Sequence, residues 1–216
     1  MKVLGVDIKD AEIGYVYSEE ELNQFKMICG GVSWPGERPG FAVVTAMDKL
    51  EHFDSHIYLI DEFESFDIRE LIRKCVGLDC IYRPKRWIGD VKKGGVERLI
   101  REMSKEAKLP IDTIGTRKLL SIYSTPILEI NQPYQYMLTK IKELLDPDPE
   151  RRQLFLKDSK ILNYLSAIEP NNIYKLEFGD YPAIEALAFA VIESKSRIRD
   201  PEKLRRHREL KEKYFG

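Results

Sequence analysis

The chain has 216 residues, of which 43% are hydrophobic and 33% are charged, and its formal net charge at pH 7 is −1. This composition is typical of a soluble globular protein with one large domain, and the near-neutral charge excludes a general electrostatic attraction to nucleic acid, so DNA binding would have to use local basic groups. The three cysteines lack metal-ligand spacing and no apolar run is long enough to cross a membrane, so we expect a cytoplasmic protein.

The first part of the chain is predicted to form an antiparallel meander. After a short strand at residues 2–8, Ser18 with Glu21 three positions later is the pattern of a capping box that begins a short helix. Three stretches rich in β-branched and aromatic residues follow, with a proline- and glycine-rich turn at 35–40 after the first. They are residues 26–34, 41–48 and 56–64. Their tight connections predict three consecutive antiparallel strands.

The second part alternates between helices and strands. An amphipathic helix at 67–77 is predicted to begin after Asp67 and to stop at Gly77. The further elements are a strand at 86–90, a helix at 95–107, a strand at 111–116, a helical stretch at 125–145 that bends or breaks near Pro133, a hairpin of 152–158 with 173–178 around a helix at 160–168, and an apolar helix at 181–196.

A meander followed by strand–helix alternation predicts a mixed α/β sheet with helices on both faces. This is the element order of the ribonuclease H-like fold. We expect residues 18–196 to form that domain, with residues 1–17 as an N-terminal segment or linker. Residues 197–216 would form a charged C-terminal helix or tail that packs little against the core.

Several strings, in this order, resemble the C-terminal nuclease domain of the large terminase subunit of tailed bacteriophages and related elements. YSEEELNQF and ICGGVSW resemble the entry to that domain, and HIYLIDEF resembles its third strand. RWIGDVKKGGVERLIREM resembles its fourth strand and following helix, and GDYPAIEALAFAV resembles its last helix. The resemblance extends over about residues 18–193, and the phosphate-binding loop of an ATPase motor does not occur in the sequence.

The resemblance implies a two-metal site that cuts DNA. In this family two Mg²⁺ or Mn²⁺ ions lie between acids of the first strand, the fourth strand and the last helix, where one activates water and the other stabilises the leaving oxygen. The corresponding metal-binding and catalytic acids here are Asp90, Asp180 and Glu185. Each also has a structural reading, as a turn or capping residue for Asp90 and Asp180 and as an acid that offsets the helix dipole for Glu185.

The sequence departs from the family pattern at two places. Ser33 stands where the first strand normally presents an aspartate, and a neutral hydroxyl is a poor bridging ligand for divalent ions. Tyr181 and Pro182 stand where two further acids are expected. Glu62, next to Asp61 in the third strand, is a candidate replacement ligand, the alternative being that both are exposed edge acids. Successive residues point to opposite faces, so only one of the pair can face the site.

Basic residues surround Asp90 in the sequence. They would form a phosphate-binding rim beside the metal site, or alternatively a solvated surface run. The residues are Arg83, Lys85, Arg86, Lys92 and Lys93.

These observations favour a metal-dependent endonuclease domain of a phage large terminase, which cuts double-stranded DNA during genome packaging in the host cytoplasm. Its partners would be double-stranded DNA and a terminase ATPase domain, the small terminase subunit or the portal. Ser33 and the Tyr181–Pro182 pair favour an alternative, a catalytically degenerate module that binds DNA or packaging proteins. Asp7 favours another, because KVLGVDIKD resembles the first strand of Holliday-junction resolvases and would supply the first acid.

Overall fold

The computed structural model describes residues 18–48, 55–89, 133–148, 151–156, 160–169 and 179–196, and the short strands at 2–3, 6–7 and 122–123. Side chains are described in these ranges except at Glu19, at 133–136 and 192–196, and in the three short strands. The predicted helix at 95–107, the strands at 111–116 and 173–178, and the C-terminal tail lie outside the described residues, as do Asp90, Lys92 and Lys93.

The core of the fold is a six-stranded mixed sheet with the order β7-β6-β3-β4-β5-β8. The predicted meander is confirmed, because β3 (Met27–Ser33), β4 (Gly40–Met47) and β5 (Ile57–Ser65) are consecutive antiparallel neighbours. On one side β6 (Arg86–Gly89) and then β7 (Ile122–Tyr123) extend the sheet in parallel with β3. The sheet is therefore mixed, as predicted, with β3 at its centre.

Two of the predicted strands differ from the structure. The strand expected at 152–158 is the short β8 (Leu154–Phe155), which pairs in parallel with β5. The single strand expected at 2–8 is a pair of two-residue strands, β1 (Lys2–Val3) and β2 (Val6–Asp7), which form a separate antiparallel sheet. Hydrophobic periodicity carries little information about strands this short, and none about which strand they pair with.

The helix α1 (Glu19–Gln24) begins with the predicted capping box. The amide of Glu21 donates to the Ser18 hydroxyl over 3.3 Å, and the Ser18 amide donates to the Glu21 carboxylate over 2.8 Å. Two backbone donors that the helix leaves without an internal partner are thus bonded by side chains.

The helix α2 (Ile68–Tyr82) begins after Asp67 as predicted but does not stop at Gly77. Its apolar face continues past the glycine with the buried Leu78, and the helix ends at Arg83, which has a left-handed φ of 50°. A glycine inside a helix costs about 1 kcal/mol relative to alanine, and the continued burial of apolar side chains outweighs that cost.

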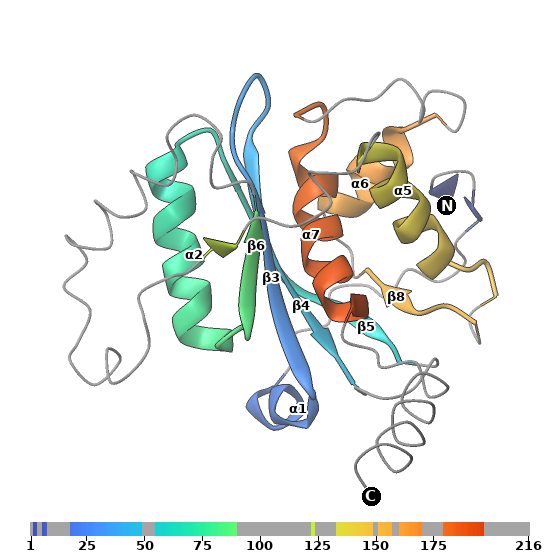
Figure 1. The fold of residues 1–216 in the computed structure, drawn as a ribbon, viewed down its shortest axis with the longest axis horizontal. Coiled ribbons are helices and arrows are strands. Elements are labelled where there is room, and N and C mark those ends of the chain that lie inside the picture. The colour runs from blue at the N-terminus through green and yellow to red at the C-terminus, as the bar shows by residue number, and fades with distance from the viewer. Residues whose placement is uncertain are drawn as a thin grey trace, which may run out of the picture.

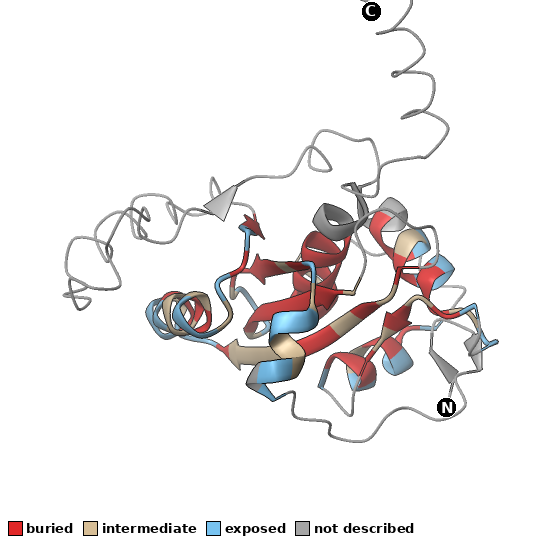
Figure 2. Ribbon diagram, turned by 90° about the horizontal axis from the view of Figure 1, so that it is seen from below, coloured by how far each residue is buried: buried red, intermediate tan, exposed pale blue. Residues whose placement is uncertain are grey.

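Helices cover both faces of the sheet, as predicted (Figure 1). α2 packs on one face, and α5 (Pro133–Leu144), α6 (Lys160–Ala167) and α7 (Pro182–Ser196) lie on the other. The buried residues form two apolar layers, one on each side of the strands (Figure 2). Among the described residues, none of the helices has the length and apolar character needed to cross a membrane.

Candidate active site

Two adjacent glycines in β3 set how closely the neighbouring elements approach the sheet. A Cβ atom on Gly31 would lie 1.9 Å from the carbonyl oxygen of Ala186 and 2.8 Å from the amide nitrogen of Ala190, both in the backbone of α7. On the opposite face, a Cβ on Gly30 would lie 2.4 Å from the ring of Trp87. Only glycine at position 31 lets the backbone of α7 pack directly on the central strand.

This close packing brings the first turn of α7 to the C-terminal end of β3. The Ser33 hydroxyl donates a hydrogen bond to Glu185 Oε2 over 2.6 Å, although the two residues are 152 positions apart in sequence. Both side chains are buried, with 4% of Ser33 and 2% of Glu185 exposed. Ser33 therefore binds the acid of the last helix directly.

The loop before α7 supplies a second donor to the same acid. The amide nitrogen of Gly179 lies 2.5 Å from Glu185 Oε1, so each carboxylate oxygen accepts a hydrogen bond. Gly179 has a φ of 98°, a backbone conformation that favours glycine. The amides of Ile184 and Glu185 donate to the Tyr181 carbonyl at the start of the helix. Asp180 is partly exposed in the same loop.

The strand register supports the predicted place of Asp90. β3 and β6 are parallel neighbours, and the last described pair is Val32 with Gly89. Ser33 follows Val32 and Asp90 follows Gly89 in the sequence. Asp90 itself lies outside the described residues, so its approach to Ser33 and Glu185 stays a prediction.

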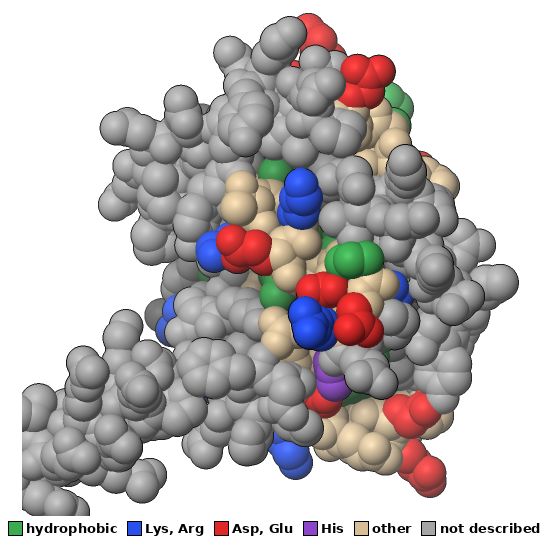
Figure 3. All heavy atoms as spheres, turned by 90° about the vertical axis from the view of Figure 1, so that its right-hand side faces the viewer, with side chains coloured by type: hydrophobic (Ala, Val, Ile, Leu, Met, Phe, Trp, Pro, Cys, Tyr) green, Lys and Arg blue, Asp and Glu red, His purple; other side chains and the backbone are tan. Residues whose placement is uncertain are grey.

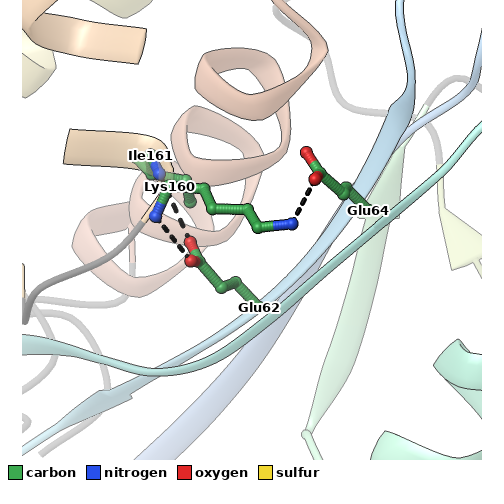
Figure 4. A network of polar contacts seen from close by, with 4 residues as sticks. All are labelled: Glu62, Glu64, Lys160 and Ile161. Carbon is green, nitrogen blue, oxygen red and sulfur yellow. Dashed lines mark hydrogen bonds and ion pairs between the residues drawn. The ribbon is translucent and has the colours of Figure 1, made fainter. Parts of the chain in front are cut away.

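Asp61 and Glu62 face opposite sides of the sheet, as expected for neighbours in a strand. Glu62 accepts hydrogen bonds from the amides of Lys160 (2.7 Å) and Ile161 (3.4 Å), while the Lys160 ammonium forms an ion pair with Glu64 (Figure 4). In this structure Glu62 therefore caps the start of α6, and its carboxylate stabilises the helix N-terminus.

Asp61 serves a similar structural purpose on the other face. The hydroxyl of Tyr82, the last residue of α2, donates to Asp61 Oδ2 over 2.9 Å. Burial, together with the hydrogen bond to Asp61 and its negative charge, raises the pKa of Tyr82 to about 12. This bond attaches the end of α2 to the sheet.

The described basic residues of the predicted phosphate-binding rim lie at the opposite end of β6. Arg83, Lys85 and Arg86 are exposed at the connection from α2 into this strand, where the Lys85 amide donates to the Ile28 carbonyl. At about 3.3 Å per residue, Arg86 is about 10 Å from Gly89 along the strand. On the face seen in Figure 3, the acidic and basic side chains of the described residues lie interspersed.

The described residues place one carboxylate, that of Glu185, at this end of the sheet. Carboxylate oxygens are the ligands that Mg²⁺ and Mn²⁺ prefer, and Glu185 presents such a group between a hydroxyl and an amide donor. Within the described ranges, no group of three or more His, Cys, Asp or Glu side chains is placed to hold a metal ion. A complete site would need Asp90.

The alternative alignment through Asp7 is wrong for this sheet. It requires the strand that carries Asp7 to be the first strand of the main sheet. Among the residues that the structure describes, that strand, β2, pairs with β1 in the separate two-stranded sheet, and β3 lies inside the main sheet. The first-strand position of the fold therefore belongs to Ser33.

Residue-level features of this site were missed by sequence reasoning. The Gly30–Gly31 doublet inside a buried strand was a readable signal of close backbone approach. Gly179 and Arg38 carried no comparable signal, because a glycine or an arginine in a polar loop is ordinary. Arg38, in the turn between β3 and β4, lies with its guanidinium carbon 4.4 Å from the centre of the Tyr181 ring.

Comparison with known proteins supports the fold. No protein-family model and no curated protein sequence matches the chain. Among solved structures, it is similar to the nuclease domain of the bacteriophage SPP1 large terminase with bound Mn, with a TM-score of 0.50 and 18% identity over 87% of this chain and 96% of that one. The chain thus has the ribonuclease H-like nuclease fold, and the expected resemblance to a terminase nuclease domain is confirmed at the level of structure.

Two further solved structures are similar at lower scores. One is the fowlpox virus resolvase in complex with Holliday junction DNA, with a TM-score of 0.44 and 12% identity over 80% of this chain and all of that one. The other is RuvC of Thermus thermophilus, with a TM-score of 0.38 and 16% identity over 79% of this chain and 96% of that one.

Proposed function

We propose that this chain is a metal-dependent DNA endonuclease domain of the phage large-terminase type, whose first-strand carboxylate is replaced by Ser33. The observation that carries the proposal is the 2.6 Å contact between Ser33 and Glu185. It joins the end of the central strand to the first turn of the last helix, the two places from which terminase-type nucleases present acids to their metal ions. A terminase ATPase domain, a small terminase subunit or a portal would be its packaging partners.

The acids that would hold Mg²⁺ or Mn²⁺ are Glu185, Asp180 and Asp90. The cation would supply Lewis acidity toward water and toward the phosphodiester. Ser33 and Gly179 act on Glu185 itself, because their two donors fix the orientation of its carboxylate. Burying an acid without such donors is costly, so the Ser33 hydroxyl and the Gly179 amide stabilise the Glu185 carboxylate at the end of the sheet.

A second candidate is a nuclease-fold module that binds DNA or packaging proteins without cutting. The contact between Ser33 and Glu185 also favours this candidate, for a different reason. Two facing carboxylates repel each other and need a cation between them, whereas a hydroxyl and a carboxylate satisfy each other by one hydrogen bond. Ser33 therefore lets Glu185 stay buried without metal.

A plasmid-nicking assay separates the two candidates. Wild-type protein, Ser33→Asp and Ser33→Asp/Asp90→Ala are compared with Mg²⁺ and with Mn²⁺. An impaired nuclease cuts slowly as wild type and faster after Ser33→Asp, and the added Asp90→Ala abolishes the gain. If Ser33→Asp is folded and stays inert with both ions, the endonuclease proposal fails and the binding module stands.

A further inference from the structure

Arg38 lies at the same end of the strands as Ser33 and Glu185. The turn between β3 and β4 begins just after Ser33, and the loop before α7 ends in Tyr181. Figure 1 shows both segments together at the upper end of the sheet, where β3 and β6 also end. The contact of 4.4 Å between the Arg38 guanidinium and the Tyr181 ring joins these two segments.

The arginine is held by its surroundings while its charge stays accessible. The Gly36 amide donates to the Arg38 carbonyl over 3.0 Å, which closes the turn around it. Tyr181 is partly buried against the core, so the ring that supports the guanidinium is fixed in turn. Arg38 is exposed, and within the described part of the chain no carboxylate forms an ion pair with it. Stacking on an aromatic face leaves the N–H edge of a guanidinium available to a planar acceptor.

A phosphate group is the acceptor that fits this position. DNA that reaches Glu185 must bring a phosphodiester toward a buried acid, and a nearby fixed cation offsets that repulsion. A guanidinium binds phosphate through two parallel hydrogen bonds, and prior fixing lowers the entropy lost on binding. The basic residues at the start of β6 cannot do this at the same place, because they lie at the other end of the strand.

We propose that Arg38, stacked on Tyr181, contacts the sugar-phosphate backbone of DNA at the end of the sheet where Ser33 and Glu185 meet. The proposal rests on the proposed function in so far as it takes DNA as the ligand. It holds for a cutting and for a non-cutting protein alike. Arg38 is a DNA-positioning residue and takes no part in bond cleavage.

Binding of a fluorescein-labelled DNA duplex tests this, measured by anisotropy in EDTA over a series of salt concentrations. Arg38→Gln removes the charge at the site edge. Arg151→Gln is the matched control, because Arg151 is an exposed arginine just before β8. β8 pairs with the start of β5, at the end of the strands away from Ser33. We expect several-fold weaker binding for Arg38→Gln, with the slope of log K against log salt reduced by about 0.9, the value for one phosphate contact. Arg151→Gln should bind as wild type.

Tyr181 variants test the stacking. Tyr181→Phe keeps the ring and should bind as wild type, whereas Tyr181→Leu should weaken binding while the protein stays folded at the assay temperature. If wild-type protein binds and Arg38→Gln has the same affinity and salt slope as Arg151→Gln, the inference is overturned and the proposed function is untouched. If wild-type protein does not bind the duplex at low salt, the inference about Arg38 fails, and the plasmid-nicking assay decides the proposed function separately.

Discussion

Ser33 and Glu185 form the contact on which the candidate site depends, and their coupling is measurable. Ser33→Ala removes a donor from a buried carboxylate and should lower the free energy of unfolding by about 1–3 kcal/mol. In a Glu185→Gln background the same change should cost less, because the group it leaves unsatisfied carries no charge. Urea unfolding of the four proteins gives the coupling as a double-mutant cycle. A coupling energy near zero would show that the contact is not formed in solution.

Tyr82 makes the free energy of unfolding depend on pH in the alkaline range. Its pKa is raised from 10.0 to about 12 in the folded chain, so the folded state holds the phenolic proton more tightly than the unfolded state does. This contribution to stability is fully present below about pH 10 and is lost as the pH rises through about 12.

The variant Tyr82→Phe isolates this contribution. It should be less stable than wild type at neutral pH, because it lacks the hydrogen bond to Asp61. The difference between the two proteins should narrow between pH 10 and about 12. Melting temperatures of both proteins over this range provide the measurement, and parallel curves would show that folding does not raise the pKa of Tyr82.

At the scale of elements, Gly31 controls the distance between β3 and α7. Gly31→Ala places a methyl group inside the backbone of the helix and should destabilise the fold by about 3 kcal/mol or more, with loss of any Mn²⁺ binding at Glu185. Gly36→Ala is the control, because a Cβ there has no atom of the structure within 4 Å. Thermal unfolding of the two variants provides the comparison. Similar melting temperatures would mean that α7 does not pack as described.

Gly77 offers the opposite test on α2. Apart from its chain neighbours and the backbone of its own helix, a Cβ atom on this glycine meets no atom within 4 Å, so alanine fits without strain. Gly77→Ala should raise the free energy of unfolding by about 0.5–1 kcal/mol, because alanine loses less backbone entropy in a helix. A denaturant titration measures the gain. No gain, or a loss, would indicate that the helix ends at the glycine, as the sequence alone had suggested.

At the scale of the whole molecule, local pattern predicted the order of elements but few of their distant contacts. The meander, the caps at Ser18 and Asp67 and the apolar last helix follow from short-range signals and are confirmed. The predicted end of α2 was wrong, because the burial of apolar side chains beyond Gly77 outweighs the low helix propensity of this glycine. The two-residue strand β8 was too short to reveal its partner.

The candidate site could be predicted only where family resemblance pointed to it. The resemblance marked Ser33 and Glu185 as positions of interest, but their hydrogen bond spans 152 residues and no local pattern encodes it. The stacking of Arg38 on Tyr181 joins two loops in the same way. Tertiary contacts of this kind depend on how the helix sits on the sheet, which the Gly31 contact with α7 sets.

We propose that Ser33 occupies the place of the first metal-binding carboxylate, opposite Glu185. The most direct test is anomalous diffraction from crystals of Ser33→Asp soaked in Mn²⁺, with Ser33→Asp/Glu185→Gln as the control. We expect an Mn²⁺ peak bound by the introduced carboxylate and Glu185, and its loss or weakening in the double variant. A well-ordered Ser33→Asp structure with no peak there, or with Mn²⁺ bound elsewhere, would contradict it.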